Sequence, residues 1–118
     1  MDFDYTETML KILGKNKFKK MVDEIKEKSE LLIDDKIIDE YCEIIFIVGV
    51  SKSFRDDCLS EKIKIKLQKP DFIGNIVKIY KEYIDEVIKF CVEQHDKCTE
   101  NHLYTELDEF IKLYELKI

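Results

Sequence analysis

Glycine and proline are scarce in this chain, which has three glycines and one proline among its 118 residues. All-β folds depend on many tight turns, and tight turns use both residue types heavily. Their scarcity therefore argues against an all-β fold and favours helices joined by short polar links.

Arginine is scarcer still, since Arg55 is the only one. Proteins that read nucleic acids rely on arginine for two-pronged contacts with bases and phosphates. The chain also carries 26 acidic residues against 20 basic ones, a formal net charge of −6. This balance argues against a nucleic-acid partner and is compatible with a basic protein partner.

Long hydrophobic runs are missing as well. The longest run, Ile44–Val50, is far shorter than the roughly 20 apolar residues that span a bilayer. The N-terminal residues Met1–Tyr5 are acidic and lack the basic stretch that begins a secretory signal. We therefore expect a cytoplasmic protein without membrane association.

Recognisable catalytic motifs are also absent. The glycines stand apart from one another, so they form no phosphate-binding loop, and no Gly-x-Ser-x-Gly elbow occurs. The segment Ser53–Cys58 places Arg55 beside Asp56 and Asp57. Adjacent carboxylates on a helix point in different directions, so these two do not form a catalytic pair. We expect no enzymatic activity and no cofactor.

What the chain does contain is typical of one folded domain. Hydrophobic residues make up 45% and charged residues 39% of the sequence, which is enough apolar content for a core. The length is close to the commonest size of a domain. We predict a single domain over residues 1–118, folded as an all-α bundle of five or six helices.

Apolar residues recur at helical spacing in segments covering about residues 5–13, 18–32, 37–50, 71–96 and 99–114. Asp4 followed by Glu7 predicts the start of the first helix, and Gly14 predicts its end. Thr99 is the predicted cap of the last helix.

Residues 44–48 allow a second interpretation, because β-branched side chains dominate them. Residues 62–67 alternate lysine with apolar residues, the pattern of a half-buried strand. Paired as a hairpin, the two segments would make an α+β fold. The helical spacing upstream, with Asp39 and Glu43 four apart on the polar side, favours a helix for 44–48.

The most specific chemical pattern joins cysteines and histidines at spacings of four, three and four: Cys91, His95, Cys98 and His102. On one continuous helix they would share a face, and both residue types are usual zinc ligands. Cys91 and His102 would nevertheless lie roughly 16 Å apart on a straight helix, too far for one ion. A shared site would need a chain reversal near Lys97–Glu100, or two molecules that each donate a Cys-His pair. Because the spacing also departs from the familiar zinc-finger patterns, we predict no metal site. Because no Cys-x-x-Cys pair occurs, we also expect no structural disulfide.

Acidic residues gather in two segments. The first segment, near the start of the third predicted helix, holds Asp34, Asp35, Asp39, Glu40 and Glu43. The second, in the last predicted helix, holds Glu100, Glu106, Asp108, Glu109 and Glu115. Of these we expect Glu106, Asp108 and Glu109 to be largely exposed and to contact the partner. If the two segments lie side by side, they form a negative surface that attracts a positive partner.

These patterns predict a non-enzymatic protein-binding module, of inhibitor or immunity type, that uses the acidic surface against a basic protein. The alternative is an adaptor or viral host-interaction bundle with an apolar groove for a partner helix. A metal- or thiol-dependent enzyme built on the Cys/His face is the third hypothesis. The sequence does not indicate the oligomeric state.

Overall fold

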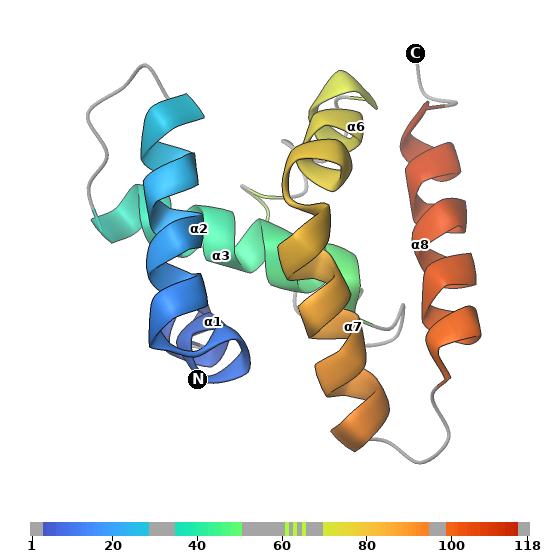
Figure 1. Cartoon of the computed structure of the whole chain (residues 1–118). Coiled ribbons are helices and arrows are strands. Elements are labelled where there is room, and N and C mark those ends of the chain that lie inside the picture. Colours follow the sequence, from blue (N-terminus) through green and yellow to red (C-terminus); the bar gives the residue numbers. More distant parts are fainter. Residues whose placement is uncertain are drawn as a thin grey trace.

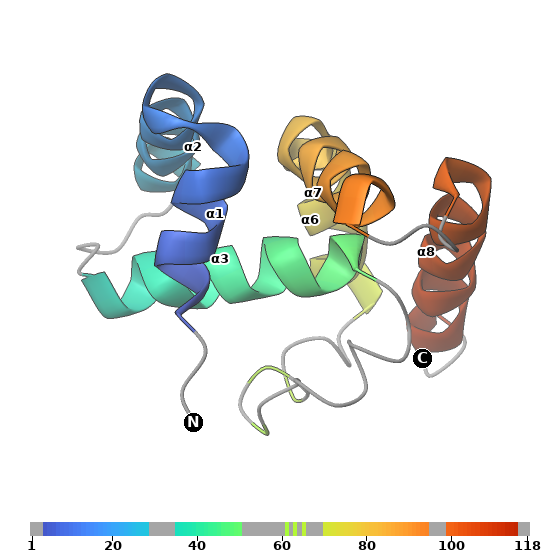
Figure 2. The same cartoon turned by 90° about the horizontal axis from the view of Figure 1, so that it is seen from below.

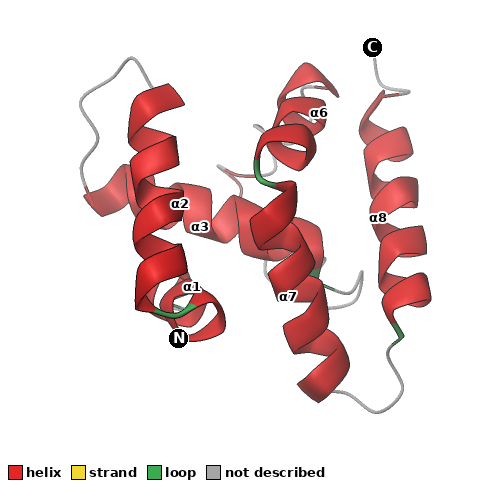
Figure 3. Cartoon of the chain, viewed as in Figure 1, coloured by secondary structure: helices red, strands yellow, loops and turns green. Residues whose placement is uncertain are grey.

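The computed structural model describes residues 4–28, 35–50, 61, 63, 65, 70–94 and 99–115 (Figure 1). These residues contain six helices and no strand (Figure 3). The helices are α1 (Tyr5–Leu13), α2 (Lys15–Lys28), α3 (Asp35–Gly49), α6 (Pro70–Ile79), α7 (Lys81–Gln94) and α8 (Glu100–Glu115). The prediction of an all-α helical bundle is confirmed.

Helix α3 is the element on which the others pack. It runs beneath the bundle, with α1 and α2 over its first half and α7 and α8 beside its second half (Figure 2). Every residue from Ile44 to Val50 is buried. A helix covered on all sides must be apolar all round, and the sequence of α3 meets this condition only from Ile44 onward.

The hairpin alternative is wrong, because residues 44–48 belong to α3. Their β-branched side chains pack in several directions, against α1 and α7, and a strand would offer them only two faces. Ile63 and Ile65 are also helical, and the other residues of 62–67 lie outside the described residues.

The predicted helix ends are confirmed where the structure describes them. The carboxylate of Asp4 accepts the Glu7 amide at 2.9 Å. Gly14 ends α1 with a positive φ of 80°, and its amide donates to the Leu10 carbonyl at 2.9 Å. The Thr99 hydroxyl accepts the amide of the third residue of α8 at 3.2 Å, so Thr99 caps that helix.

The segment predicted as one helix over 71–96 is two helices, separated at Tyr80. The Tyr80 carbonyl accepts the amides of Tyr83 and Ile84, both at 3.0 Å, as the residue before a new helix does. The Tyr80 ring is 3% exposed and meets the Tyr41 ring edge-on, with 6.1 Å between centroids. No glycine or proline lies near Tyr80 to indicate this break in the sequence. At the break, the large aromatic side chain of Tyr80 is buried in the core.

One cluster of buried apolar side chains links all the described helices. The interior positions of α2 (Met21 and Ile25) and of α7 (Tyr83 and Val87) are each 0% exposed. Among the described helices, none combines the length and the apolar character needed to cross a membrane.

We predict that Gly49→Ala destabilises the protein by about 1–3 kcal/mol. A Cβ at this position would lie 2.8 Å from Cγ1 of Val87 and 3.3 Å from the Ile84 carbonyl oxygen. Both neighbours lie on buried α7, so neither can move without disturbing the core.

Gly74→Ala is the matched control for this prediction. Gly74 is exposed within α6, and a Cβ there would meet nothing within 4 Å. This substitution should stabilise the helix by up to about 1 kcal/mol, since alanine has the higher helix propensity. Urea unfolding measures both changes, and a harmless Gly49→Ala would contradict the close approach of α3 to α7.

We also predict that Ile84→Ala lowers the free energy of unfolding by about 2–4 kcal/mol, because the Ile84 side chain is 1% exposed in the core. Lys81→Ala should change it by less than about 0.5 kcal/mol. The Lys81 side chain is 68% exposed, and its ion pair with Asp85 at 3.4 Å is screened by solvent. Equal losses from the two variants in thermal unfolding would show that the faces of α7 are misassigned.

Candidate functional site

The first acidic segment is drawn into the packing of α3 against α1. Asp39 is half-buried, and its carboxylate accepts the Thr6 hydroxyl at 2.8 Å and the Thr6 amide at 3.3 Å. Glu40 and Glu43 are half-buried too, while Asp34 lies outside the described residues. The carboxylates in this part of α3 are therefore less accessible to a partner than the sequence suggests.

The second acidic segment keeps an open face. Asp108 and Glu109 are exposed on α8, opposite the buried side chains of Leu103 and Leu107. Glu106 is not largely exposed, and the expectation for this residue is wrong. Its side chain retains 17% of its accessible surface, and one of its carboxylate oxygens lies 2.9 Å from Nε2 of His102.

The two acidic segments do not lie side by side. Helix α3 begins on the side of the molecule that carries α1 and α2, whereas α8 lies on the opposite side in both views (Figures 1 and 2). A single negative surface built from both segments is therefore not formed, and only α8 is a candidate acidic face.

The Cys/His pattern is only partly described. Cys91 is buried on α7, His102 is exposed on α8, and His95 and Cys98 lie outside the described residues, as does Ser53–Cys58. Within the described ranges, no group of three or more metal-binding side chains is placed to hold an ion.

Cys42 and Cys91 are both buried thiols, and within the described part of the chain they form no disulfide. Burial raises the pKa of the Cys42 thiol to about 12. Cys42 therefore stays protonated at neutral pH and is a poor nucleophile.

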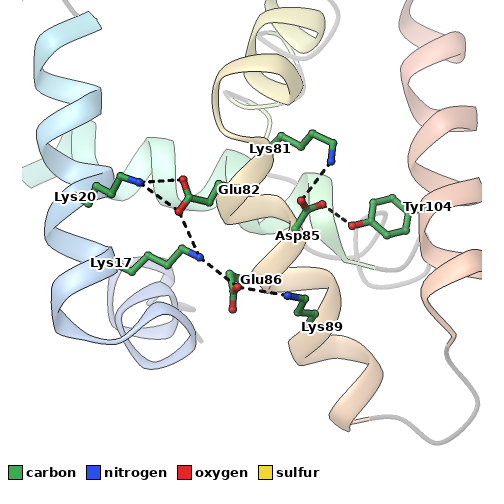
Figure 4. A network of polar contacts seen from close by, with 8 residues as sticks. All are labelled: Lys17, Lys20, Lys81, Glu82, Asp85, Glu86, Lys89 and Tyr104. Carbon is green, nitrogen blue, oxygen red and sulfur yellow. Dashed lines mark hydrogen bonds and ion pairs between the residues drawn. The ribbon is translucent and has the colours of Figure 1, made fainter.

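Two sets of polar contacts that the sequence did not predict join α7 to its neighbours, one to α2 and the other to α8 (Figure 4). Lys17 of α2 lies 3.2 Å from Glu86 and 3.5 Å from Glu82, both on α7. Lys20 reaches Glu82 at 3.2 Å, and Lys89 meets Glu86 at 3.7 Å. Lysine side chains of α2 thus reach across to carboxylates of α7.

The pKa values of two members of the α2–α7 set reflect their partners. Burial alone would lower the pKa of Lys17, but its hydrogen bond with Glu86 and the charges of Glu86 and Glu82 raise it overall. The hydrogen bond from Lys20 lowers the pKa of Glu82, with smaller contributions from the charges of Lys20 and Lys17. Both groups therefore stay charged at neutral pH.

A separate set of contacts joins α7 to α8 through Asp85. The Asp85 carboxylate accepts a hydrogen bond from the Tyr104 hydroxyl and also pairs with Lys81. Burial and Asp85 raise the pKa of Tyr104 to about 12, so this phenol stays a donor at neutral pH. Tyr104 thereby holds the side of α8 that faces α7, while the carboxylates of Asp108 and Glu109 are exposed.

Lysine and acid are distributed unevenly between the outer helices. Helix α2 contains six lysines and three acids, whereas α8 contains five acids and one lysine, Lys112. Glu100, Asp108 and Glu109 are exposed, and none of them makes an ion pair with the described residues. We name the adjacent residues Asp108 and Glu109 the α8 acidic face; Glu100 is nine residues before Glu109 and therefore lies on the opposite side of the helix. The sequence places these two acids together, but it does not show that they would lie across the molecule from the lysines of α2.

We predict that Glu82→Gln lowers the free energy of unfolding by less than about 1 kcal/mol at neutral pH and low salt. The loss is small because the Glu82 side chain is 48% exposed. It should shrink further at about 1 M salt, where screening is strong. The folded-state pKa of Glu82 is lowered, so its contribution is present above its unfolded pKa and is lost as the pH falls through the folded pKa.

Glu93→Gln provides the control, because Glu93 is exposed on the same helix and forms no ion pair with the described residues. Urea unfolding of both variants at two salt concentrations and two pH values gives the comparison. Equal, salt-independent effects of the two substitutions would show that the α2–α7 charges contribute nothing to stability.

Comparisons with family models, curated proteins and solved structures gave no match for this chain. Its function must therefore be inferred from its own geometry and charge.

Proposed function

We propose that this protein is a non-enzymatic binding module, of inhibitor or immunity type, that recognises a basic protein partner through the α8 acidic face. The observation that carries the proposal is the contrast between two sets of carboxylates. Those of α7 at Glu82, Asp85 and Glu86 are paired with lysines of this chain. Those of the α8 acidic face make no ion pair with the described residues, although Lys112 is exposed one turn away.

An acidic face whose carboxylates make no ion pair within the described residues suits the capture of a positive partner. Its field reaches about one Debye length, roughly 8–10 Å at physiological salt, and steers a partner of opposite charge into contact. The face is carried by a helix whose inner side is held by Leu103, Leu107 and the Tyr104–Asp85 hydrogen bond. Rigid placement lowers the entropy lost on binding.

The apolar-groove alternative has less support in the described residues. The exposed large hydrophobic residues among them are Leu10, Ile65 and Ile79, with exposures of 38%, 64% and 37%. They belong to separate parts of the chain, whereas a groove for a helix needs contiguous apolar surface. The enzyme alternative gains nothing from Cys42, whose thiol is buried and protonated.

The test is the double charge reversal Asp108→Lys/Glu109→Lys, applied to association with the basic protein that the full chain captures from its native cells. At low salt, the association rate constant should fall by about tenfold or more, and most of its salt dependence should disappear. Stopped-flow or surface-based kinetics measure both quantities.

The matched control is Asp23→Lys/Glu27→Lys on α2. It makes the same change in net charge at two exposed acids, but on the opposite side of the molecule. Its association rate should change much less than that of the α8 variant. Equal effects, or none in the α8 variant, would contradict a role for the α8 acidic face.

A further inference from the structure

A lysine of this chain lies on the face of a buried aromatic ring. The Nζ of Lys28, the last residue of α2, is 5.7 Å from the centroid of the Tyr80 ring. This distance is within the range in which a cation is attracted to the electron-rich face of an aromatic ring. Lys28 is exposed while Tyr80 is 3% exposed, so the lysine is one of the groups that cover the ring.

Two further tyrosines surround the same point. Tyr41 of α3 meets Tyr80 edge-on at 6.1 Å between centroids, and Tyr83 of α7 lies at 6.4 Å in a tilted arrangement. The Tyr83 hydroxyl is buried and has no hydrogen-bond partner of ordinary geometry among the described residues. Three aromatic rings from different elements thus gather beside the end of α2.

A carboxylate accompanies these rings. Glu24 is half-buried and lies one turn before Lys28 on the same face of α2. Burial and, after it, Tyr41 and Glu24 raise the pKa of Tyr80 to about 12. Burial and, after it, a hydrogen-bonding interaction with Glu24 and the charge of Glu24 raise the pKa of Tyr83, so the Glu24 carboxylate acts on both phenols.

Lys28 lies on the ring, and it makes no ion pair with Glu24, although lysine and glutamate at this helical spacing commonly pair. The cluster therefore combines an aromatic face that already holds an ammonium group with a carboxylate that has no ion pair among the described residues. This combination is the recognition chemistry for an alkylammonium ion.

We propose that the Tyr80 ring, with Glu24 beside it, is a binding site for the ammonium group of a partner's lysine side chain, and that Lys28 occupies this site until that lysine displaces it. Only the source of the cation, a basic protein partner, is taken from the proposed function. The site itself is independent of that function, because it lies beside α2 and away from the α8 acidic face.

Displacement has a defined consequence for affinity. An incoming lysine must compete with Lys28 for the Tyr80 ring. The apparent affinity for that lysine therefore equals the intrinsic affinity multiplied by the fraction of molecules in which Lys28 leaves the ring uncovered. Lys28 itself loses little, because its ammonium group returns to water at an exposed position. The site is therefore weak for a single lysine and becomes selective when the rest of the partner is already bound.

The experiment titrates the full chain with Nα-acetyl-lysine methylamide and follows the tyrosine ring resonances by NMR. Lys28→Ala should bind this probe about fivefold more tightly than Lys26→Ala, a control that removes an exposed lysine of α2 with no ring contact. The Nε-acetylated probe, which has no charge, should shift no ring resonance in either variant. Equal affinity of the two variants for the charged probe would overturn the proposal.

A second pair of variants keeps the test decisive. In the Lys28→Ala background, Tyr80→Leu removes the ring and Tyr80→Phe retains it, so only the first should weaken probe binding, by about fivefold. If Tyr80→Leu fails to fold by circular dichroism, Glu24→Gln replaces it and should weaken binding several-fold. Unchanged binding in these variants rejects the site.

The two proposals fail separately. If the α8 charge reversal slows partner association while Lys28→Ala and Lys26→Ala bind the probe equally, the acidic face stands and the lysine site falls. If the probe binds as expected but the α8 reversal changes nothing, the lysine site stands and the role of α8 falls.

Discussion

Burial of the second half of α3 on all sides is the constraint on which the rest of the structure depends. Each fully buried branched side chain there contributes about 1.5–3 kcal/mol relative to exposure, but only if other helices exclude water from every side. Helix α7 lies beside this half, Tyr5 of α1 packs against Phe46 within it, and Gly49 lets α7 approach closely. The more polar first half of α3 also packs against α1, because the Thr6 hydroxyl of α1 donates a hydrogen bond to the half-buried carboxylate of Asp39.

The position of α7 on α3 then determines how α2 and α8 are attached. Helix α2 buries Met21 and Ile25 in the core. Its Lys17 and Lys20 form ion pairs with carboxylates of α7 at the surface between the two helices. Helix α8 docks through Leu107 and the bond from Tyr104 to Asp85. The break at Tyr80 places three tyrosines where α2, α3 and α7 meet, and Lys28 covers the ring that results.

Charge is segregated as a result of this packing. Lysines of α2 pair with carboxylates of α7, whereas the carboxylates of the α8 acidic face make no ion pair among the described residues. A protein that binds through such a face gains speed and selectivity from electrostatics more than raw affinity. A second contact of different chemistry, such as a lysine on the Tyr80 ring, would add the short-range specificity that long-range attraction lacks.

The sequence by itself determined the helical class, the buried second half of α3, the caps at Asp4, Gly14 and Thr99, and the buried faces of α2 and α7, because these follow from local chemistry and from the 3.6-residue period. It did not determine the break at Tyr80, which no local breaker residue marks and which depends on rings brought in by other helices. Nor did it determine which acids stay open. Asp39 and Glu106 resemble Asp108 in the sequence, but Thr6 and His102 cover the first two. Only the tertiary structure decided this difference, because exposure and ion pairing depend on neighbours that are distant along the chain or across a helix turn.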